Sequence, residues 1–197
     1  MHIIISEGSV MKILAIAGSL RKESYNLQLA QSAQNLVHKL DPSIEFNILD
    51  WSEVPLFNQD IEFPTPKSVS HARKAVLEAD GIWFFTPEYN HSIPGVLKNL
   101  IDWLSRPVSS DQKQVLIDKP AALSGASIAM GGTAESQDAL ASLLSFLGMH
   151  IMGIPRLVIA HVSEQSDEEG RLVLGRSLAY LEREAKAYIK FIEKFKA

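Results

Sequence analysis

Short apolar runs alternate along the chain with segments of helical periodicity. Five runs have the length and the β-branched, small or aromatic content of buried strands. They cover residues 12–17, 44–49, 81–86, 120–124 and 156–162. Residues 81–86 are apolar almost throughout, which is typical of a central strand covered on both faces. Residues 44–49 alternate between apolar and polar, which is typical of a strand near a sheet edge.

Between these runs, apolar residues recur at spacings of three and four, the period of an amphipathic helix. The pattern predicts helices over about 26–40, 67–79 and 92–104, a fourth that carries Leu140 to Leu147 and ends at Gly148, and a fifth over 178–195. Ser92 is expected to cap the third helix, with Pro94 in its first turn. Strands alternating with helices predict an α/β fold: a doubly wound parallel sheet with right-handed crossovers and helices on both faces.

The composition fits one globular domain of 197 residues, 46% of them hydrophobic. A formal net charge of −4 gives no reason to expect a nucleic-acid partner or an anionic membrane surface. The chain has no cysteine, which excludes disulfides, thiolate catalysis and cysteine-ligated metals and favours a reducing cytoplasm. Residues 1–10 are interpreted as an N-terminal extension, and residues 11–197 as the folded domain.

Residues 18–26, GSLRKESYN, follow the first predicted strand and lead into a helix. A loop in this position directs backbone N–H groups and the positive end of the helix dipole outward, which suits an anion. Ser19, Ser24 and Asn26 add side-chain donors, and Arg21 adds a charged fork suited to a phosphate monoester. The alternative is a solvated turn in which Ser24 or Asn26 only caps the helix.

Two further unusual loops follow the third and fourth strands, PEYNHS at 87–92 and GASIAMGG at 125–132. Because parallel strands end at the same sheet edge, these loops and the first one are expected to converge there. The chain contains neither G-x-G-x-x-G nor G-x-x-x-x-G-K-[ST], which disfavours a tightly held dinucleotide of the usual type and a nucleotide triphosphatase. One phosphate loop with aromatic and small-residue loops beside it fits flavin mononucleotide (FMN).

Residues 51–66 contain three prolines and show no periodicity. A loop of this length inside a compact domain is typically a lid or a binding loop. The equally weighted alternative is a packed connector held down by Leu56, Phe57 and Phe63.

In these motifs the chain resembles the NADPH-dependent FMN reductase family of flavodoxin-like proteins, which includes quinone, azo-dye and chromate reductases. The resemblance rests on residues 18–26, on TPEYNHSIPGVLKNLIDW at 86–103, and on Lys119 and Pro120 leading to 125–127. It extends from about Met11 to Val162. It implies a flavodoxin-like five-stranded parallel sheet in the order 2-1-3-4-5.

The resemblance also implies which residues bind the flavin. Those expected at its phosphate are Ser19, Leu20, Arg21, Ser24 and Asn26. Those expected along its isoalloxazine ring are Pro87, Glu88, Tyr89, Asn90 and Ser127. After Ser127 the chain has Ile128-Ala129-Met130, where the family usually has glycines or a proline.

The activity implied by the resemblance is that of an NAD(P)H-dependent, FMN-containing oxidoreductase. It would transfer two electrons by ping-pong hydride transfer to quinones, free flavin, azo compounds or similar acceptors. Because the cofactor carries this chemistry, no catalytic side chain is predicted. NADPH or NADH is the expected co-substrate, a small electron acceptor the expected partner, and a homodimer or homotetramer the expected assembly.

Two other functions remain open as alternatives. A flavodoxin-type carrier would pass single electrons to a protein partner, but such carriers are typically more acidic and have a Thr-rich phosphate loop. A hydrolase is suggested by Gly125-Ala126-Ser127-Ile128-Ala129, which resembles G-x-S-x-G without its second glycine.

The remaining polar candidates have structural interpretations. The histidines His91, His150 and His161 are not at metal-ligand spacing, so no metal site is predicted. Glu88 has, besides a role at the flavin, the alternative of a solvated carboxylate or a subunit contact.

Overall fold

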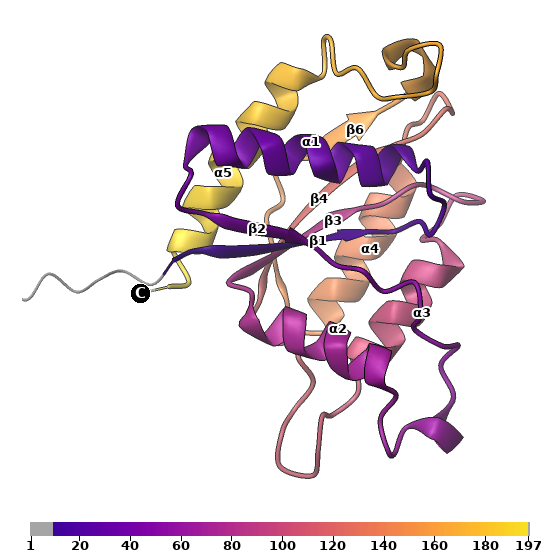
Figure 1. Ribbon diagram of the computed structural model, residues 1–197, viewed down its shortest axis with the longest axis vertical. Helices are drawn as coiled ribbons and strands as arrows, with labels where there is room; N and C mark the ends of the chain where they lie inside the picture. Colours follow the sequence, from indigo (N-terminus) through magenta and orange to yellow (C-terminus); the bar gives the residue numbers. More distant parts are fainter. Residues whose placement is uncertain (1–9, 197) are drawn as a thin grey trace, which may run out of the picture.

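The computed structural model describes residues 10–196, which form one parallel sheet between two layers of helices (Figure 1). The strands are β1 (Lys12–Ala17), β2 (Glu45–Ile48), β3 (Gly81–Phe85), β4 (Pro120–Ala126), β5 (His150–Ile151) and β6 (Leu157–Ile159). The helices are α1 (Tyr25–Leu40), α2 (Lys67–Glu78), α3 (Gly95–Leu104), α4 (Ala134–Phe146) and α5 (Leu178–Glu193), with 3-10 turns at Gln59–Ile61 and Val162–Gln165.

The sheet has the order β2-β1-β3-β4-β5, and its pairings are parallel. This confirms the doubly wound order 2-1-3-4-5 expected from the sequence. The predicted extension at residues 1–10 lies, apart from Val10, outside the described residues. Across residues 10–196, none of the helices combines the length and the apolar character that crossing a membrane requires.

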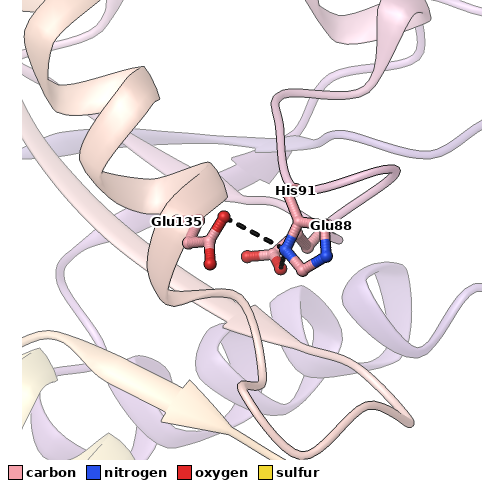
Figure 2. Close-up of side chains that lie close together, drawn as sticks. All are labelled: Glu88, His91 and Glu135. Atoms are coloured by element: carbon pink, nitrogen blue, oxygen red, sulfur yellow. Dashed lines mark ion pairs between the residues drawn. The ribbon is translucent and has the colours of Figure 1, made fainter.

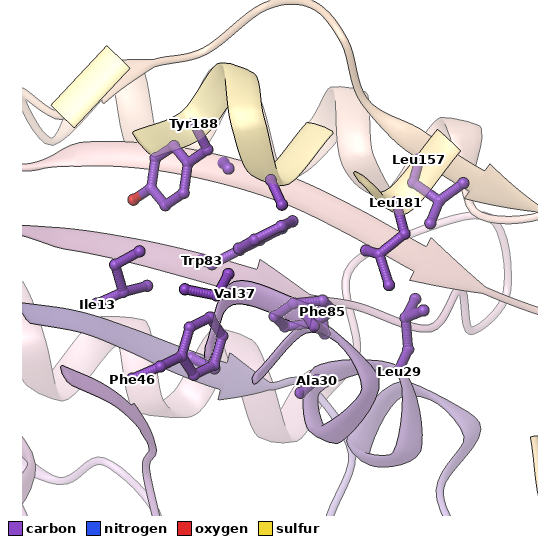
Figure 3. Packing of buried hydrophobic residues seen from close by; sticks show 14 of the residues in the cluster. Ile13, Leu29, Ala30, Val37, Phe46, Trp83, Phe85, Leu157, Leu181 and Tyr188 are labelled. Atoms are coloured by element: carbon purple, nitrogen blue, oxygen red, sulfur yellow. The ribbon is translucent and has the colours of Figure 1, made fainter. Parts of the chain in front are cut away.

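The central strand β3 shows why two helical layers are needed. Trp83 and Phe85 belong to the core beneath α1 and α5, which Figure 3 shows, whereas Ile82 and Phe84 belong to the core beneath α2, α3 and α4. All four side chains are completely buried. Because successive strand residues point to opposite faces, a strand apolar at every position needs cover on both sides.

The fifth position of the sheet differs from the prediction of one strand over 156–162. It is divided between β5, which pairs with Pro120 and Ala121 at the start of β4, and β6, which pairs with Ser124 to Ala126 at its end. The chain leaves the sheet between the two, so neither strand exceeds three residues. Residues 160–162, included in the predicted strand, instead lead into the 3-10 turn. A two-residue strand is too short to leave a recognisable periodicity in the sequence.

Helix α3 begins later than expected. Its first residue is Gly95, and Pro94 occupies the N-cap without a side-chain hydrogen bond. Ser92 does not cap the helix; it exchanges two backbone hydrogen bonds with Tyr89, with N···O distances of 3.2 and 3.1 Å. Ser92 therefore closes the turn that precedes the helix instead of capping it.

The segment 51–66 is attached to α3, which supports its interpretation as a packed connector. The Asn99 side chain accepts a hydrogen bond from the backbone N–H of Phe57 (2.7 Å) and donates one to the carbonyl of Pro55 (2.9 Å). The indole N–H of Trp103 donates to the same carbonyl (2.8 Å). The Trp103 and Phe57 rings pack edge-to-face, with their centroids 4.9 Å apart.

Of the three apolar residues expected to hold this segment, only Phe57 does so. Leu56 and Phe63 are 81% and 63% exposed. A second attachment is ionic, because the Glu62 carboxylate accepts two hydrogen bonds from Arg106 at 2.9 and 3.2 Å. The connector is therefore fixed at two places, and Leu56 and Phe63 beside these attachments are exposed to solvent.

Glu184 of α5 carries a buried carboxyl group, which lies between this helix and the sheet. Its Oε2 accepts a hydrogen bond from the Ser124 hydroxyl (2.8 Å), and that hydroxyl accepts one from the indole N–H of Trp83 (2.8 Å). Burial raises the pKa of Glu184 to about 8, although the hydrogen bond from Ser124 acts in the opposite direction. Glu184 is therefore mainly protonated at neutral pH.

The buried carboxyl group predicts a pH dependence of stability. In the unfolded chain a glutamate ionises near pH 4.5, whereas folded Glu184 keeps its proton up to about pH 8, so the free energy of unfolding falls as pH rises between these values. Glu184→Gln keeps an acceptor for Ser124 but cannot ionise. We expect urea unfolding at pH 5 and pH 8 to show a smaller loss of stability in this variant, by a few kcal/mol at most. Equal losses of stability in the wild-type protein and the variant would contradict the conclusion that folded Glu184 is protonated at neutral pH.

Candidate functional site

The three loops singled out in the sequence meet at the carboxyl edge of β1, β3 and β4. These strands are neighbours in the sheet, so their ends lie side by side. The loop after β1 is joined to the end of β3 by a hydrogen bond from the Gly18 N–H to the Phe85 carbonyl (2.8 Å). The convergence expected for ligand sites in such sheets is therefore present.

Two glycines allow this close approach. A Cβ atom on Gly18 would lie 2.9 Å from Leu97 Cδ2 of α3 and 3.3 Å from Pro87 Cδ. A Cβ on Gly125 would overlap the side chain of Thr133 and the carbonyl of Thr86. A side chain at Gly125 would displace the backbone at Thr86, and one at Gly18 would displace Leu97 or the loop itself, so glycine at both positions allows the close approach.

The loop after β1 offers donors to solvent. Within residues 10–196, the backbone N–H groups of Leu20, Lys22 and Glu23 have no recorded hydrogen-bond acceptor, and the loop leads directly into the N-terminus of α1. The Arg21 side chain is 63% exposed, and its guanidinium lies 3.8 Å from the exposed carboxylate of Glu23. A helix N-terminus with free N–H groups and a nearby guanidinium is suited to bind a phosphate.

Ser24 and Asn26, also predicted to bind the phosphate, are engaged within the protein. Ser24 is 4% exposed and is the N-cap of α1, its hydroxyl accepting from the Leu27 N–H at 3.4 Å. Asn26 is 2% exposed and exchanges two hydrogen bonds of 2.9 Å with the backbone of Ala126. These side chains shape the loop and tie α1 to the end of β4.

Tyr89 connects the first loop to the second. Its hydroxyl lies 3.2 Å from the Ser19 hydroxyl, and its side chain is 48% exposed. Asn90 is also exposed, whereas Pro87 is buried. The predicted phosphate loop (residues 18–26) and the predicted ring loop (residues 87–92) are thus joined by this hydrogen bond between Ser19 and Tyr89.

Glu88 has a partner that the sequence did not indicate. Its side chain is 11% exposed, and Oε2 accepts a hydrogen bond from the backbone N–H of Ser136 (3.0 Å) in the first turn of α4. The Ser136 hydroxyl in turn donates to the Pro87 carbonyl (2.9 Å). Glu88 is therefore not a solvated carboxylate; it satisfies the N-terminus of α4 and fixes the ring loop to that helix.

The turn after Glu88 brings a histidine to two carboxylates (Figure 2). Nδ1 of His91 lies 3.1 Å from Glu135 of α4 and 3.7 Å from Glu88. One possible ligand atom of each residue lies within 4.8 Å of the others, a spacing that metal sites share, although exposed acidic groups are common without a metal ion. This group was not predicted from the sequence, because Glu135 is distant along the chain from Glu88 and His91.

Ser127 lies at the third loop and is half-buried. Its N–H donates to the Ile159 carbonyl (2.9 Å), and its hydroxyl accepts from the Ala129 N–H (3.1 Å). Within residues 10–196 no histidine or carboxylate is recorded as a partner of this hydroxyl, so the geometry of an activated serine nucleophile is missing there. The hydrolase alternative has no support.

A pocket of about 240 Å³ opens beside the phosphate loop. Leu20 and Arg21 line one side, and Asp50 and Trp51 at the end of β2 line the other. The indole N–H of Trp51 donates to the Ala17 carbonyl (3.2 Å), which fixes this wall to the end of β1.

Comparison with known proteins identifies the family. The sequence model of the NADPH-dependent FMN reductases matches residues 11–164. The chain belongs to this family. An NAD(P)H-dependent FMN reductase of Pseudomonas aeruginosa is 38% identical over 178 residues, which cover 90% of this chain and 92% of that protein. A 2-hydroxy-1,4-benzoquinone reductase of Burkholderia sp. is 36% identical over 87% of this chain and 91% of its own.

Among solved structures, this member of the FMN reductase family is similar to FerB, a flavoenzyme NAD(P)H:(acceptor) oxidoreductase from Paracoccus denitrificans. The TM-score is 0.82 at 31% identity, with 94% of this chain and 99% of FerB covered. The family resemblance, the flavodoxin-like fold and an NAD(P)H- and FMN-dependent oxidoreductase activity at the family level are thereby confirmed.

The two glycines lead to a test of the site's shape. Gly18→Ala introduces a methyl group against the Leu97 side chain and Pro87, so that either the buried Leu97 side chain or the phosphate loop must shift. We expect FMN affinity, measured by quenching of flavin fluorescence, to fall by about tenfold, the equivalent of about 1.4 kcal/mol of overpacking strain. Gly95→Ala is the matched control, because nothing lies within 4 Å of its added Cβ. Equal affinities in the two variants would show that the approach at Gly18 is unimportant.

Proposed function

We propose that this protein is an FMN-containing oxidoreductase that takes two electrons from NADPH or NADH and passes them to a small-molecule acceptor. The observation that carries the proposal is the junction of a phosphate loop and a ring loop at one sheet edge, joined through Ser19 and Tyr89. Membership of the NADPH-dependent FMN reductase family supports the same reaction.

The phosphate of FMN would be held by the loop after β1. The free N–H groups of this loop, the Ser19 hydroxyl and the Arg21 guanidinium supply complementary donors, and the α1 N-terminus favours the negative charge. Ser24 and Asn26 would hold the loop in place without contacting the phosphate. Ser24 caps α1, and Asn26 makes two hydrogen bonds to the backbone of Ala126.

The flavin ring would lie along Pro87 to Asn90, with Ser127 at its other edge. Tyr89 offers an exposed aromatic face for stacking, and Glu88 holds the backbone of this loop against α4. When bound, FMN supplies the chemistry of hydride acceptance and donation, so the side chains bind and orient and none need act as an acid or base.

We propose a planar, redox-active acceptor such as a quinone, a free flavin or an azo compound. Ile128 and Met130, which follow Ser127, are 67% and 82% exposed and give this side of the site an apolar rim. Such a rim suits a flat aromatic molecule more than a charged one. A related protein in Burkholderia is named for reducing 2-hydroxy-1,4-benzoquinone.

The single-electron carrier is the second candidate. A flavodoxin from the domain Archaea resembles this chain with a TM-score of 0.57 at 12% identity, which shows a shared fold alone. Reduction by a nicotinamide nucleotide distinguishes the two functions.

The test begins with protein mixed with FMN, desalted, and then given NADPH or NADH without air. We expect retained flavin absorption that is bleached in one two-electron step and restored by a quinone. Arg21→Ala should lose the flavin on desalting, whereas Arg176→Ala, which removes a similarly exposed and ion-paired arginine at Glu164, should retain it. Flavin that neither nucleotide bleaches would favour the carrier, and no retained flavin in the wild-type protein would count against the proposal.

We further propose a cytoplasmic homodimer or homotetramer. The absence of cysteine supports a reducing compartment. The exposed Leu56 and Phe63 of the 51–66 connector support association, because solvent-exposed apolar side chains gain from a partner surface. Light scattering of the flavin-loaded protein should give a multiple of 21.8 kDa, and a monomer alone would exclude the assembly.

A further inference from the structure

The turn formed by residues 89–92 has an unusual backbone. Asn90 and His91 both have left-handed conformations, with φ angles of 51° and 58°. Two consecutive non-glycine residues in this region are unfavourable unless surrounding contacts hold them, although asparagine and histidine tolerate it better than most. The backbone pair between Tyr89 and Ser92 is one such contact.

The second contact is the pairing of His91 with carboxylates on two elements. Glu88 comes from the same loop and is immobilised by the Ser136 N–H, and Glu135 comes from the first turn of α4. His91 itself is 80% exposed, so its position depends on these partners rather than on burial. A protonated imidazole ring is attracted to both carboxylates, whereas a neutral ring is attracted much less.

The charged surroundings of His91 are predominantly negative. Within residues 10–196, its recorded ion pairs are those with Glu88 and Glu135. The next charged residue on α4 is Asp138, which pairs with Arg156 at 2.9 Å. Arg156 is therefore paired with a carboxylate other than the two beside His91. The charged groups next to His91 are thus two carboxylates.

Tyr89 and Asn90, the residues expected at the flavin ring, belong to this same turn. We propose that His91 is a positioning residue: its protonated ring fastens the 89–92 turn to α4, so that flavin binds more tightly when His91 is charged. This inference rests on the proposed function, because it concerns the affinity of the same site for FMN. It makes the affinity of the site for FMN depend on pH.

The test compares FMN dissociation constants of variant and wild-type protein between pH 5.5 and 8.5. His91→Asn removes the charge but keeps a residue suited to the left-handed backbone, and Glu135→Gln removes the partner on α4. The FMN phosphate titrates in the same range, but it affects both proteins equally and cancels in the ratio of the constants. His150→Asn is the control, since His150 pairs with Asp118 at the opposite end of the sheet.

We expect His91→Asn to weaken FMN binding by about threefold at pH 5.5 and by less than about 1.5-fold at pH 8.5, as for an exposed ion pair. Glu135→Gln should give the same pH profile, and the double variant should be no weaker than either single one. A ratio independent of pH, or the same profile in His150→Asn, would overturn the inference while leaving the FMN site intact. Failure of the wild-type protein to bind FMN at any pH would overturn the proposed function as well.

Discussion

The site depends on how closely the ends of β1, β3 and β4 approach one another. At Gly18 a single added carbon would meet Leu97 and Pro87, and at Gly125 it would meet Thr133 and the backbone of Thr86. Because parallel strands in register bring these positions to one edge, the two missing side chains set the spacing of all three loops. Polar groups can then connect the loops over hydrogen-bond distances.

Helix α3 supports both the loops and the connector outside them. Leu97 packs beneath Gly18, and Asn99 and Trp103 hold Pro55 and Phe57 of the 51–66 segment. The long motif at 86–103 therefore combines residues of the ring loop with residues whose contacts are purely structural. This explains why so extended a motif accompanies a reaction for which the cofactor supplies the chemistry.

The polar residues of the three loops divide into two groups. Ser19, Arg21 and Tyr89 remain accessible and are available to a ligand. Asn26 and Glu88 satisfy backbone groups of β4 and α4, where an unpaired buried N–H or carbonyl would be costly. A residue can thus lie at a binding loop and act by holding its shape.

Strand and helix periods are local signals, so the sequence was enough to predict most of the secondary structure, the sheet class and the edge at which the loops gather. The predicted fifth strand over 156–162 contains β6 but is too long, and β5 was missed because two residues leave no periodicity. Ser92 was predicted to cap α3, but it pairs with Tyr89 instead. The sequence did not predict that Asn26 binds Ala126, 100 residues away, or that Glu88, His91 and Glu135 meet; the structure shows both. Contacts between distant residues depend on how the elements pack, and packing leaves no periodic trace in the chain.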